Sequence, residues 1–147
     1  MKAINEAKLE FWSRSANEGF ARTTAACFAA QLDPTLDEIN DIKTAVSEAV
    51  TNCIVHAYPD ELGMVKLRLR LLEDSIIEIT VKDKGVGIPD VARAREPLYT
   101  TGNEERSGMG FTIMESFTDE MKVRSQVGKG TTVVLRKRIA RRRGQVR

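Results

Sequence analysis

One segment of the sequence carries polar side chains at a spacing suited to acid–base and metal chemistry. Glu48, Asn52 and His56 are four residues apart, and this spacing places them on one face of a helix. A carboxylate one turn from a carboxamide oxygen can act as a general base beside a ligand for a hard cation. The alternative is a solvated helix face, because polar side chains are mostly exposed.

A second motif is the stretch Asp83-Lys84-Gly85-Val86-Gly87-Ile88-Pro89, which directly follows a predicted strand. Two glycines separated by one residue let the backbone approach a flat ligand closely. An aspartate at the end of the strand can accept a hydrogen bond from an exocyclic amine such as that of adenine. The alternative is a tight glycine turn. The stretch lacks the third glycine of the dinucleotide fingerprint.

Two shorter motifs follow along the chain. Gly108-Met109-Gly110 opens a predicted helix after a long loop, and free amides beside glycines at such a helix start can bind phosphate. Gly130-Thr131 begins the last predicted strand, where a small hydroxyl could reach a ligand. Each of the two is a weak signal by itself, and Gly-Thr is equally typical of an ordinary turn.

The first elements that must position these motifs are a strand and a helix. Residues 4–11 alternate loosely between apolar and polar side chains, which predicts an edge strand. Ser15 and Glu18 form a capping-box pattern, and the helix they open ends at Asp33-Pro34. The apolar stripe predicted for this helix consists of Phe20, Thr24, Cys27, Phe28 and Leu32.

A longer helix carries the first motif. Thr35 and Glu38 form a second capping box at its start, and the helix ends near Tyr58-Pro59. Its apolar stripe lies opposite Glu48 and Asn52. This helix is therefore expected to bury one face and to present the two polar side chains on the other.

The remaining pattern predicts strands and a long loop. Alternation predicts a hairpin over 64–72 and 76–81, and a second hairpin over 121–125 and 131–138. Between them, 83–110 indicates a functional loop with a short helix near 91–95, and 109–117 is helical. Strands that follow helices predict an α+β two-layer sandwich, with a mixed, mostly antiparallel sheet and helices on one face.

Composition excludes several classes of protein. The 147 residues suffice for one domain. The net charge is only +2, but it is unevenly distributed, because seven of the 23 Lys and Arg residues lie in 136–147. A mildly acidic body argues against direct nucleic-acid binding. No run approaches the ~20 apolar residues of a membrane span, and no signal peptide is evident, so we expect a cytoplasmic protein without a membrane partner. Cys27 and Cys53 form no pairing motif and are expected to be small core residues.

The four motifs, in this order, resemble the ATP-binding domain of the Bergerat type shared by gyrase, the ninety-kilodalton heat-shock chaperones, histidine kinases and mismatch-repair ATPases. The resemblance covers about residues 4–138. Three longer stretches look like the serine kinases that act as anti-sigma factors, above all the anti-sigma-F family of spore-forming bacteria: 31–35, 47–52 and 106–115. The resemblance thus implies an ATP-binding serine kinase domain over 1–138 and a basic C-terminal tail over 139–147.

This resemblance also implies roles for single residues. Glu48 would be the general base, Asn52 the Mg²⁺ ligand, and Asp83 the carboxylate that reads adenine. The other implied nucleotide contacts are Gly85, Gly87, Thr101, Arg106, Gly108, Gly110 and Thr131. The loop 97–107 would form a lid over the nucleotide. Arg22 matches a partner-binding arginine of the family, with a solvated helix charge as the alternative.

The function implied is that of an anti-sigma factor with kinase activity. Such a protein binds and inhibits a sporulation sigma factor of the F type, and uses ATP to phosphorylate a serine of its anti-anti-sigma antagonist. It would bind ATP or ADP with Mg²⁺ and form a homodimer. The alternatives are a non-enzymatic ATP-gated interaction module, which would not need Glu48, and a histidine-kinase fragment. The second conflicts with a single histidine, His56, on the catalytic helix.

Overall fold

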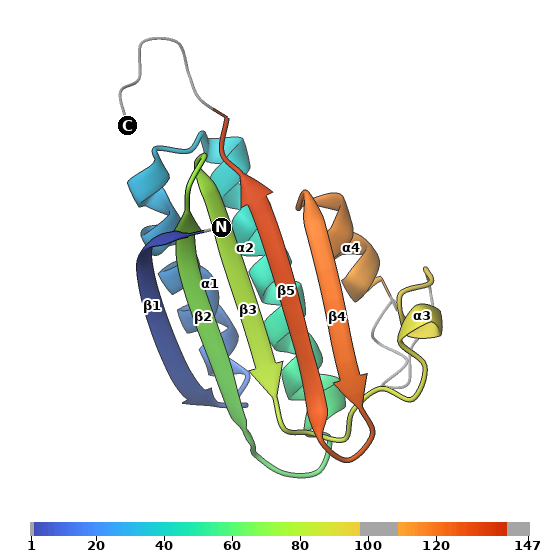
Figure 1. Ribbon diagram of the computed structural model, residues 1–147. Helices are drawn as coiled ribbons and strands as arrows, with labels where there is room; N and C mark the ends of the chain where they lie inside the picture. Colours follow the sequence, from blue (N-terminus) through green and yellow to red (C-terminus); the bar gives the residue numbers. More distant parts are fainter. Residues whose placement is uncertain (1, 98–108, 141–147) are drawn as a thin grey trace.

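The computed structural model describes residues 2–97 and 109–140, which form two layers (Figure 1). One layer is a five-stranded sheet in the order β1-β2-β3-β5-β4. The strands are β1 (Ala3–Trp12), β2 (Met64–Leu72), β3 (Ile76–Asp83), β4 (Glu120–Gln126) and β5 (Gly130–Arg138). The helical segments are α1 (Ala16–Ala29), η1 (Ala30–Leu32), α2 (Leu36–Asn52), the π-type turn η2 (Cys53–Ala57), α3 (Val91–Ala94) and α4 (Gly110–Ser116).

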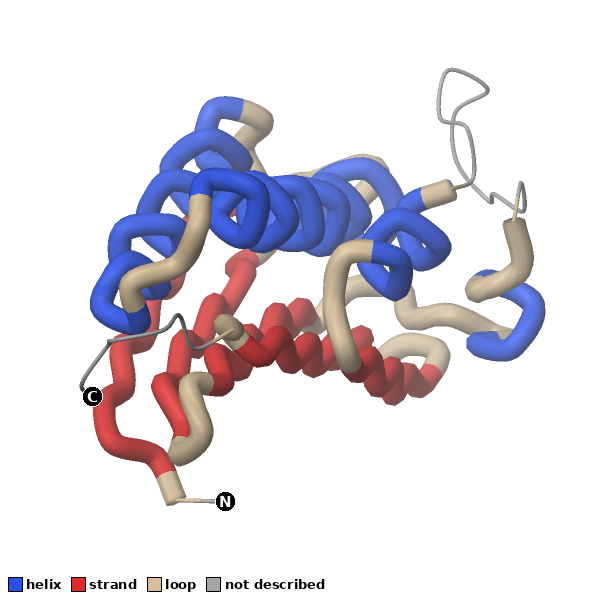
Figure 2. The backbone as a smooth tube through the Cα atoms, turned by 90° about the horizontal axis from the view of Figure 1, so that it is seen from above, coloured by secondary structure: helices blue, strands red, loops and turns tan. Residues whose placement is uncertain are grey.

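The predicted α+β sandwich is confirmed. The helices cover one face of the sheet (Figure 2). Each of the four strand pairs between described residues is antiparallel, and β1 is an edge strand as expected. The core lies between the layers, where the inward side chains of β2 and β3 meet the apolar face of α2.

The order of the strands brings two distant motifs together. After β3 the chain passes through α3, α4 and β4, and returns as β5 between β3 and β4. Lys82 near the end of β3 therefore pairs with Thr132 near the start of β5. This register sets Asp83 beside Thr131, although 48 residues separate them along the chain.

The buried face of the first helix matches the predicted stripe only in part, with Leu32 in the core and Phe28 packed against it. Ala21, Ala25 and Ala29 are fully buried, whereas Phe20 is 52% exposed and Cys27 is exposed. The prediction of a buried Cys27 was wrong. Alanines at a spacing of four let the α1 backbone pack closely, and Phe20 and Cys27 then lie on the outer side.

Of the two predicted capping boxes, one is confirmed. Glu38 N–H donates to Thr35 Oγ1 at 3.1 Å, and Thr35 N–H donates to Glu38 Oε1 at 2.9 Å. The box at Ser15 was wrong, because Ser15 itself has helical φ and ψ and its side chain makes no capping bond. The Glu18 carboxylate instead pairs with Arg22 at 2.8 Å.

The sheet continues into the first residues after β5. Ile139 is buried, and its N–H donates to the Ser75 carbonyl at 2.8 Å. Ala140 N–H donates to Glu38 Oε2 at 2.9 Å. The rest of the predicted basic tail, 141–147, lies outside the described residues, and a domain boundary at 138 stays a prediction. None of the helices in the described part is long and apolar enough to cross a membrane.

Candidate functional site

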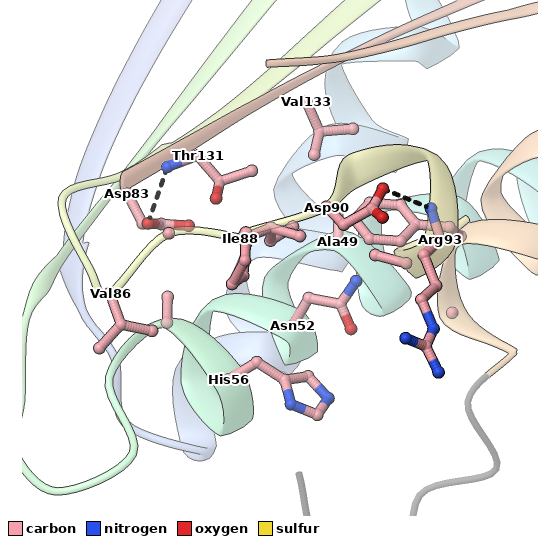
Figure 3. A pocket seen from close by; sticks show the side chains of 16 residues that line it. Ala49, Asn52, His56, Asp83, Val86, Ile88, Asp90, Arg93, Thr131 and Val133 are labelled. Atoms are coloured by element: carbon pink, nitrogen blue, oxygen red, sulfur yellow. Dashed lines mark hydrogen bonds between the residues drawn. The ribbon is translucent and has the colours of Figure 1, made fainter. Parts of the chain in front are cut away.

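A cavity of about 280 Å³ opens between the end of α2, the ends of β3 and β5, and the segment that contains α3 (Figure 3). Five predicted site residues line it: Asn52, Asp83, Gly87, Gly110 and Thr131. His56 lines it as well, so it shares this side of the helix with Asn52, as predicted. Apolar side chains such as Ile88, Phe111 and Val133 form much of the remaining wall, which suits a flat aromatic ligand.

Asp83 lies at one end of this cavity and is 6% exposed. Oδ1 accepts hydrogen bonds from the N–H of Gly85 at 3.0 Å and of Thr131 at 3.1 Å. Burial raises the pKa of Asp83 above its usual value, although these two N–H groups and the Cys53 thiol act in the opposite direction. The structure thus holds a buried hydrogen-bond acceptor in the wall of a largely apolar cavity.

Thr131 lines the cavity and also contacts two side chains around it. Its hydroxyl lies 2.7 Å from Ser125 Oγ, and its backbone N–H contacts Asp83 (Figure 3).

Gly85 does not line the cavity. A side chain on Gly85 would collide with the Ala57 carbonyl, so this glycine permits close packing of the loop on the end of the α2 segment.

Glu48 and Asn52 meet Gly110 at the start of α4. A Cβ atom on Gly110 would lie 3.1 Å from Asn52 Oδ1 and 3.4 Å from Glu48 Oε2. The Asn52 carboxamide oxygen is a ligand of the kind that a hard cation prefers, and it fits Mg²⁺ that is held mainly by phosphate oxygens. The Glu48 carboxylate lies on the same side of Gly110. Within the described ranges no cluster of three or more His, Cys, Asp or Glu residues forms a metal cage.

Glu48 also borders a second cavity, between α1 and α2. This cavity is lined by Glu18, Arg22, Asn40, Lys43, Thr44, Ser47 and Glu48. The predicted general base and the predicted partner-binding arginine therefore share one opening. Glu48 lies between this opening and the first cavity, whose wall includes Gly110.

The sequence reasoning missed Arg93. Asp90 accepts the Arg93 N–H at 3.1 Å and so starts α3, and Arg93 lines the first cavity. Figure 3 shows Arg93 far from Asp83, with Asn52 between them. A lone arginine in a short helix forms no motif, so no pattern in the sequence marked it. The predicted contacts Thr101, Arg106 and Gly108, and most of the predicted lid, lie outside the described residues.

Comparison with known proteins decides the family. The model of the histidine kinase-like ATPase domain matches residues 11–137. An anti-sigma F factor of Geobacillus kaustophilus is 59% identical over 93% of this chain and 94% of its own length. One from Caldanaerobacter subterraneus subsp. tengcongensis is 56% identical over 97% of this chain and 100% of its own. The chain belongs to the anti-sigma F family.

Solved structures agree with the fold of this anti-sigma F family member. A crystal structure of the RsbU and RsbW domains of a Mycobacterium tuberculosis protein superposes with a TM-score of 0.68 at 20% identity, over 92% of this chain. The match spans about a third of that protein, 32%. A blue-light activated histidine kinase of Erythrobacter litoralis gives 0.59 at 24% identity, over 80% of this chain and 40% of its own.

Membership of an ATPase family implies that the chain binds ATP or ADP.

Proposed function

We propose that this anti-sigma factor is an ATP-dependent serine kinase that binds and inhibits a sigma factor of the F type and phosphorylates its anti-anti-sigma antagonist. One observation carries the proposal: Glu48 lies between the cavity that contains Asp83 and the opening that contains Arg22. A base in this place can serve a nucleotide on one side and a protein hydroxyl on the other. A module that only binds nucleotide needs no base there.

The nucleotide orientation follows from the two ends of the first cavity. Asp83 accepts a hydrogen bond from the exocyclic amine of adenine, so the adenine ring occupies the apolar part of the cavity. The phosphates then lie toward Gly110, Asn52 and Arg93. Asn52 and the phosphates would hold Mg²⁺, which would supply positive charge to the γ-phosphoryl group.

Glu48 performs the proton transfer in this scheme. Its carboxylate takes the proton of the serine hydroxyl while the serine oxygen bonds to the γ-phosphorus and the bond to the bridging oxygen of ADP breaks. Phosphoryl transfer depends mostly on positioning and charge neutralisation. The convergence of Glu48 and Asn52 on Gly110 supports this arrangement.

Arg22 is the proposed partner contact. Its guanidinium pairs with Glu18 and lines the opening beside Glu48, so a protein bound there would bring its hydroxyl toward the base. We include the homodimer in the proposal, and sedimentation of the purified chain measures it. A monomer at all concentrations would refute this part.

The test of the activity uses ATP labelled on the γ-phosphate, the purified chain and an anti-anti-sigma protein. We expect acid-stable label on a serine of the antagonist, and none when that serine is replaced by alanine. Acid-labile label on His56 would support the histidine-kinase fragment. Nucleotide binding without any transfer would support the interaction module.

Arg93 offers a separate prediction about the phosphates. It is the one Lys or Arg among the described residues that line the first cavity, which also contains the Asp83 and Asp90 carboxylates. A polyphosphate placed there needs a cation, so Arg93→Gln should weaken ATP and ADP binding about tenfold, the effect of losing a hydrogen bond to a charged group. Calorimetry should show unchanged affinity for adenosine, which lacks the phosphates.

A neighbouring arginine provides the matched control for this prediction. Arg95 belongs to the same segment, but it pairs with Glu115 at 3.1 Å and does not line the cavity. Arg95→Gln should leave all three affinities unchanged, because an exposed ion pair contributes little. Equal losses for ATP and adenosine in Arg93→Gln would contradict a phosphate contact.

A further inference from the structure

The last turn of the α2 segment changes its winding just where it meets the Asp83 loop. Residues Cys53–Ala57 form a π-type turn, and such local insertions in a helix are frequent at functional sites. From this turn the Ala57 carbonyl accepts the Val86 N–H at 3.0 Å. The Tyr58 hydroxyl, directly after it, accepts the Lys84 N–H at 2.7 Å. The turn therefore holds the backbone of the loop on both sides of Gly85.

The same turn contacts the Asp83 side chain through Cys53. The thiol sulfur lies 3.5 Å from Asp83 Oδ2, within hydrogen-bond reach for sulfur. Cys53 is 4% exposed. A cysteine thiol carries its proton at neutral pH, so the sulfur donates the hydrogen bond and the carboxylate oxygen accepts it.

The two oxygens of Asp83 are thus held in different ways. Oδ1 accepts two backbone N–H groups, from Gly85 and Thr131. For Oδ2, the contact found among the described residues is the Cys53 thiol. Rotation about the Cβ–Cγ bond would move both oxygens together, so each of these hydrogen bonds opposes it. The thiol is the donor that acts directly at Oδ2.

We propose that Cys53 is a positioning residue for adenine recognition: its thiol holds Asp83 Oδ2 at the angle from which this oxygen accepts the exocyclic amine of the base. The proposal rests on the proposed function, in which Asp83 reads adenine. It differs from a packing role, the usual one for a buried cysteine. A packing role would affect all nucleotides alike, whereas a positioning role affects those that carry the amine.

The test compares ATP with purine riboside triphosphate, which has hydrogen in place of the 6-amino group. Calorimetry gives the ratio of the two affinities for wild type, Cys53→Ala and Cys53→Ser. We expect the ratio to fall about fivefold in Cys53→Ala, because a thiol is a weak donor even toward a charged acceptor. Cys53→Ser, which keeps a donor, should restore most of the ratio. Cys27→Ala is the matched control, since Cys27 is exposed on α1.

Two outcomes separate this proposal from the proposed function. If wild type binds both nucleotides equally, Asp83 does not read the amine, and the Cys53 proposal falls with it. If wild type prefers ATP and Cys53→Ala keeps the full preference, or loses affinity for both nucleotides by the same factor, the Cys53 proposal alone is wrong.

A second measurement does not depend on the folding of a Cys53 variant. Cys27→Ser leaves Cys53 as the sole thiol of the chain, so its S–H stretching band in the infrared spectrum reports this hydrogen bond directly. The band should lie at the frequency of a hydrogen-bonded thiol and should shift when ATP binds. A band typical of a free thiol, or one that purine riboside triphosphate shifts as much as ATP does, would overturn the proposal.

Discussion

Glu48→Gln should bind ATP with nearly wild-type affinity and yet transfer phosphate to the antagonist ~10²–10⁴-fold more slowly, the usual contribution of a general base. Glutamine preserves the size of the side chain and an oxygen beside Asn52, but it cannot take a proton. Glu48 does not line the cavity assigned to the nucleotide, so the substitution leaves the walls of that cavity intact. Binding and catalysis should therefore separate in this variant.

Single-turnover transfer of the labelled γ-phosphate measures the catalytic loss, and calorimetry measures ATP affinity. Glu115→Gln is a matched control, because Glu115 is an exposed carboxylate on α4 that pairs with Arg95. It should leave both quantities unchanged. An unimpaired transfer rate in Glu48→Gln would remove Glu48 from the role of base. A large loss of ATP affinity would assign it to binding instead.

Asp83→Asn should reduce ATP affinity about 10- to 100-fold, in line with the loss of a charge-assisted hydrogen bond in a buried site. The carboxylate accepts on both oxygens, whereas the amide places an NH₂ group on one side. That NH₂ group would face either the N–H donors of Gly85 and Thr131 or the amine of adenine. In either arrangement two hydrogen-bond donors would point at each other. Calorimetry with ATP measures the effect.

A pH series sharpens the same prediction. Because burial raises the pKa of Asp83, its carboxylate gains a proton at a higher pH than an ordinary aspartate does. The ATP affinity of the wild type should fall as the pH is lowered toward the pKa of Asp83, since a protonated carboxyl is a weaker hydrogen-bond acceptor than a carboxylate. Asp83→Asn should lack this dependence. Asp60→Asn, at an exposed loop position, should behave as wild type, and wild-type affinity in Asp83→Asn would refute the assignment.

Some elements could be predicted because their signals are local. The Thr35 capping box needs only residues three apart, and the structure has both of its bonds. The relation of Asn52 to Glu48 depends on the helical repeat alone. Both side chains accordingly meet Gly110 from one side of α2.

Other predictions failed because a local pattern allowed two answers. The first helix has apolar residues on two faces, and hydrophobicity favoured the one with Phe20 and Cys27. The structure buries Ala21 and Ala25 in place of Phe20 and Cys27, since small side chains allow the close approach of two backbones. Ser15 and Glu18 have the residue types and spacing of a capping box, but the backbone of Ser15 is already helical.

The sequence by itself determined the kind of chemistry: a carboxylate and an amide one helical turn apart, an aspartate before two glycines, and a glycine at a helix start. Helix and strand periodicity are properties of neighbouring residues, so such relations can be read along the chain. Tertiary structure decided how these groups meet. Thr131 contacts Asp83 because β5 inserts between β3 and β4, and Cys53 contacts it because the π-type turn lies against the same loop. Contacts between residues so distant along the chain depend on strand order and packing, which no local pattern records.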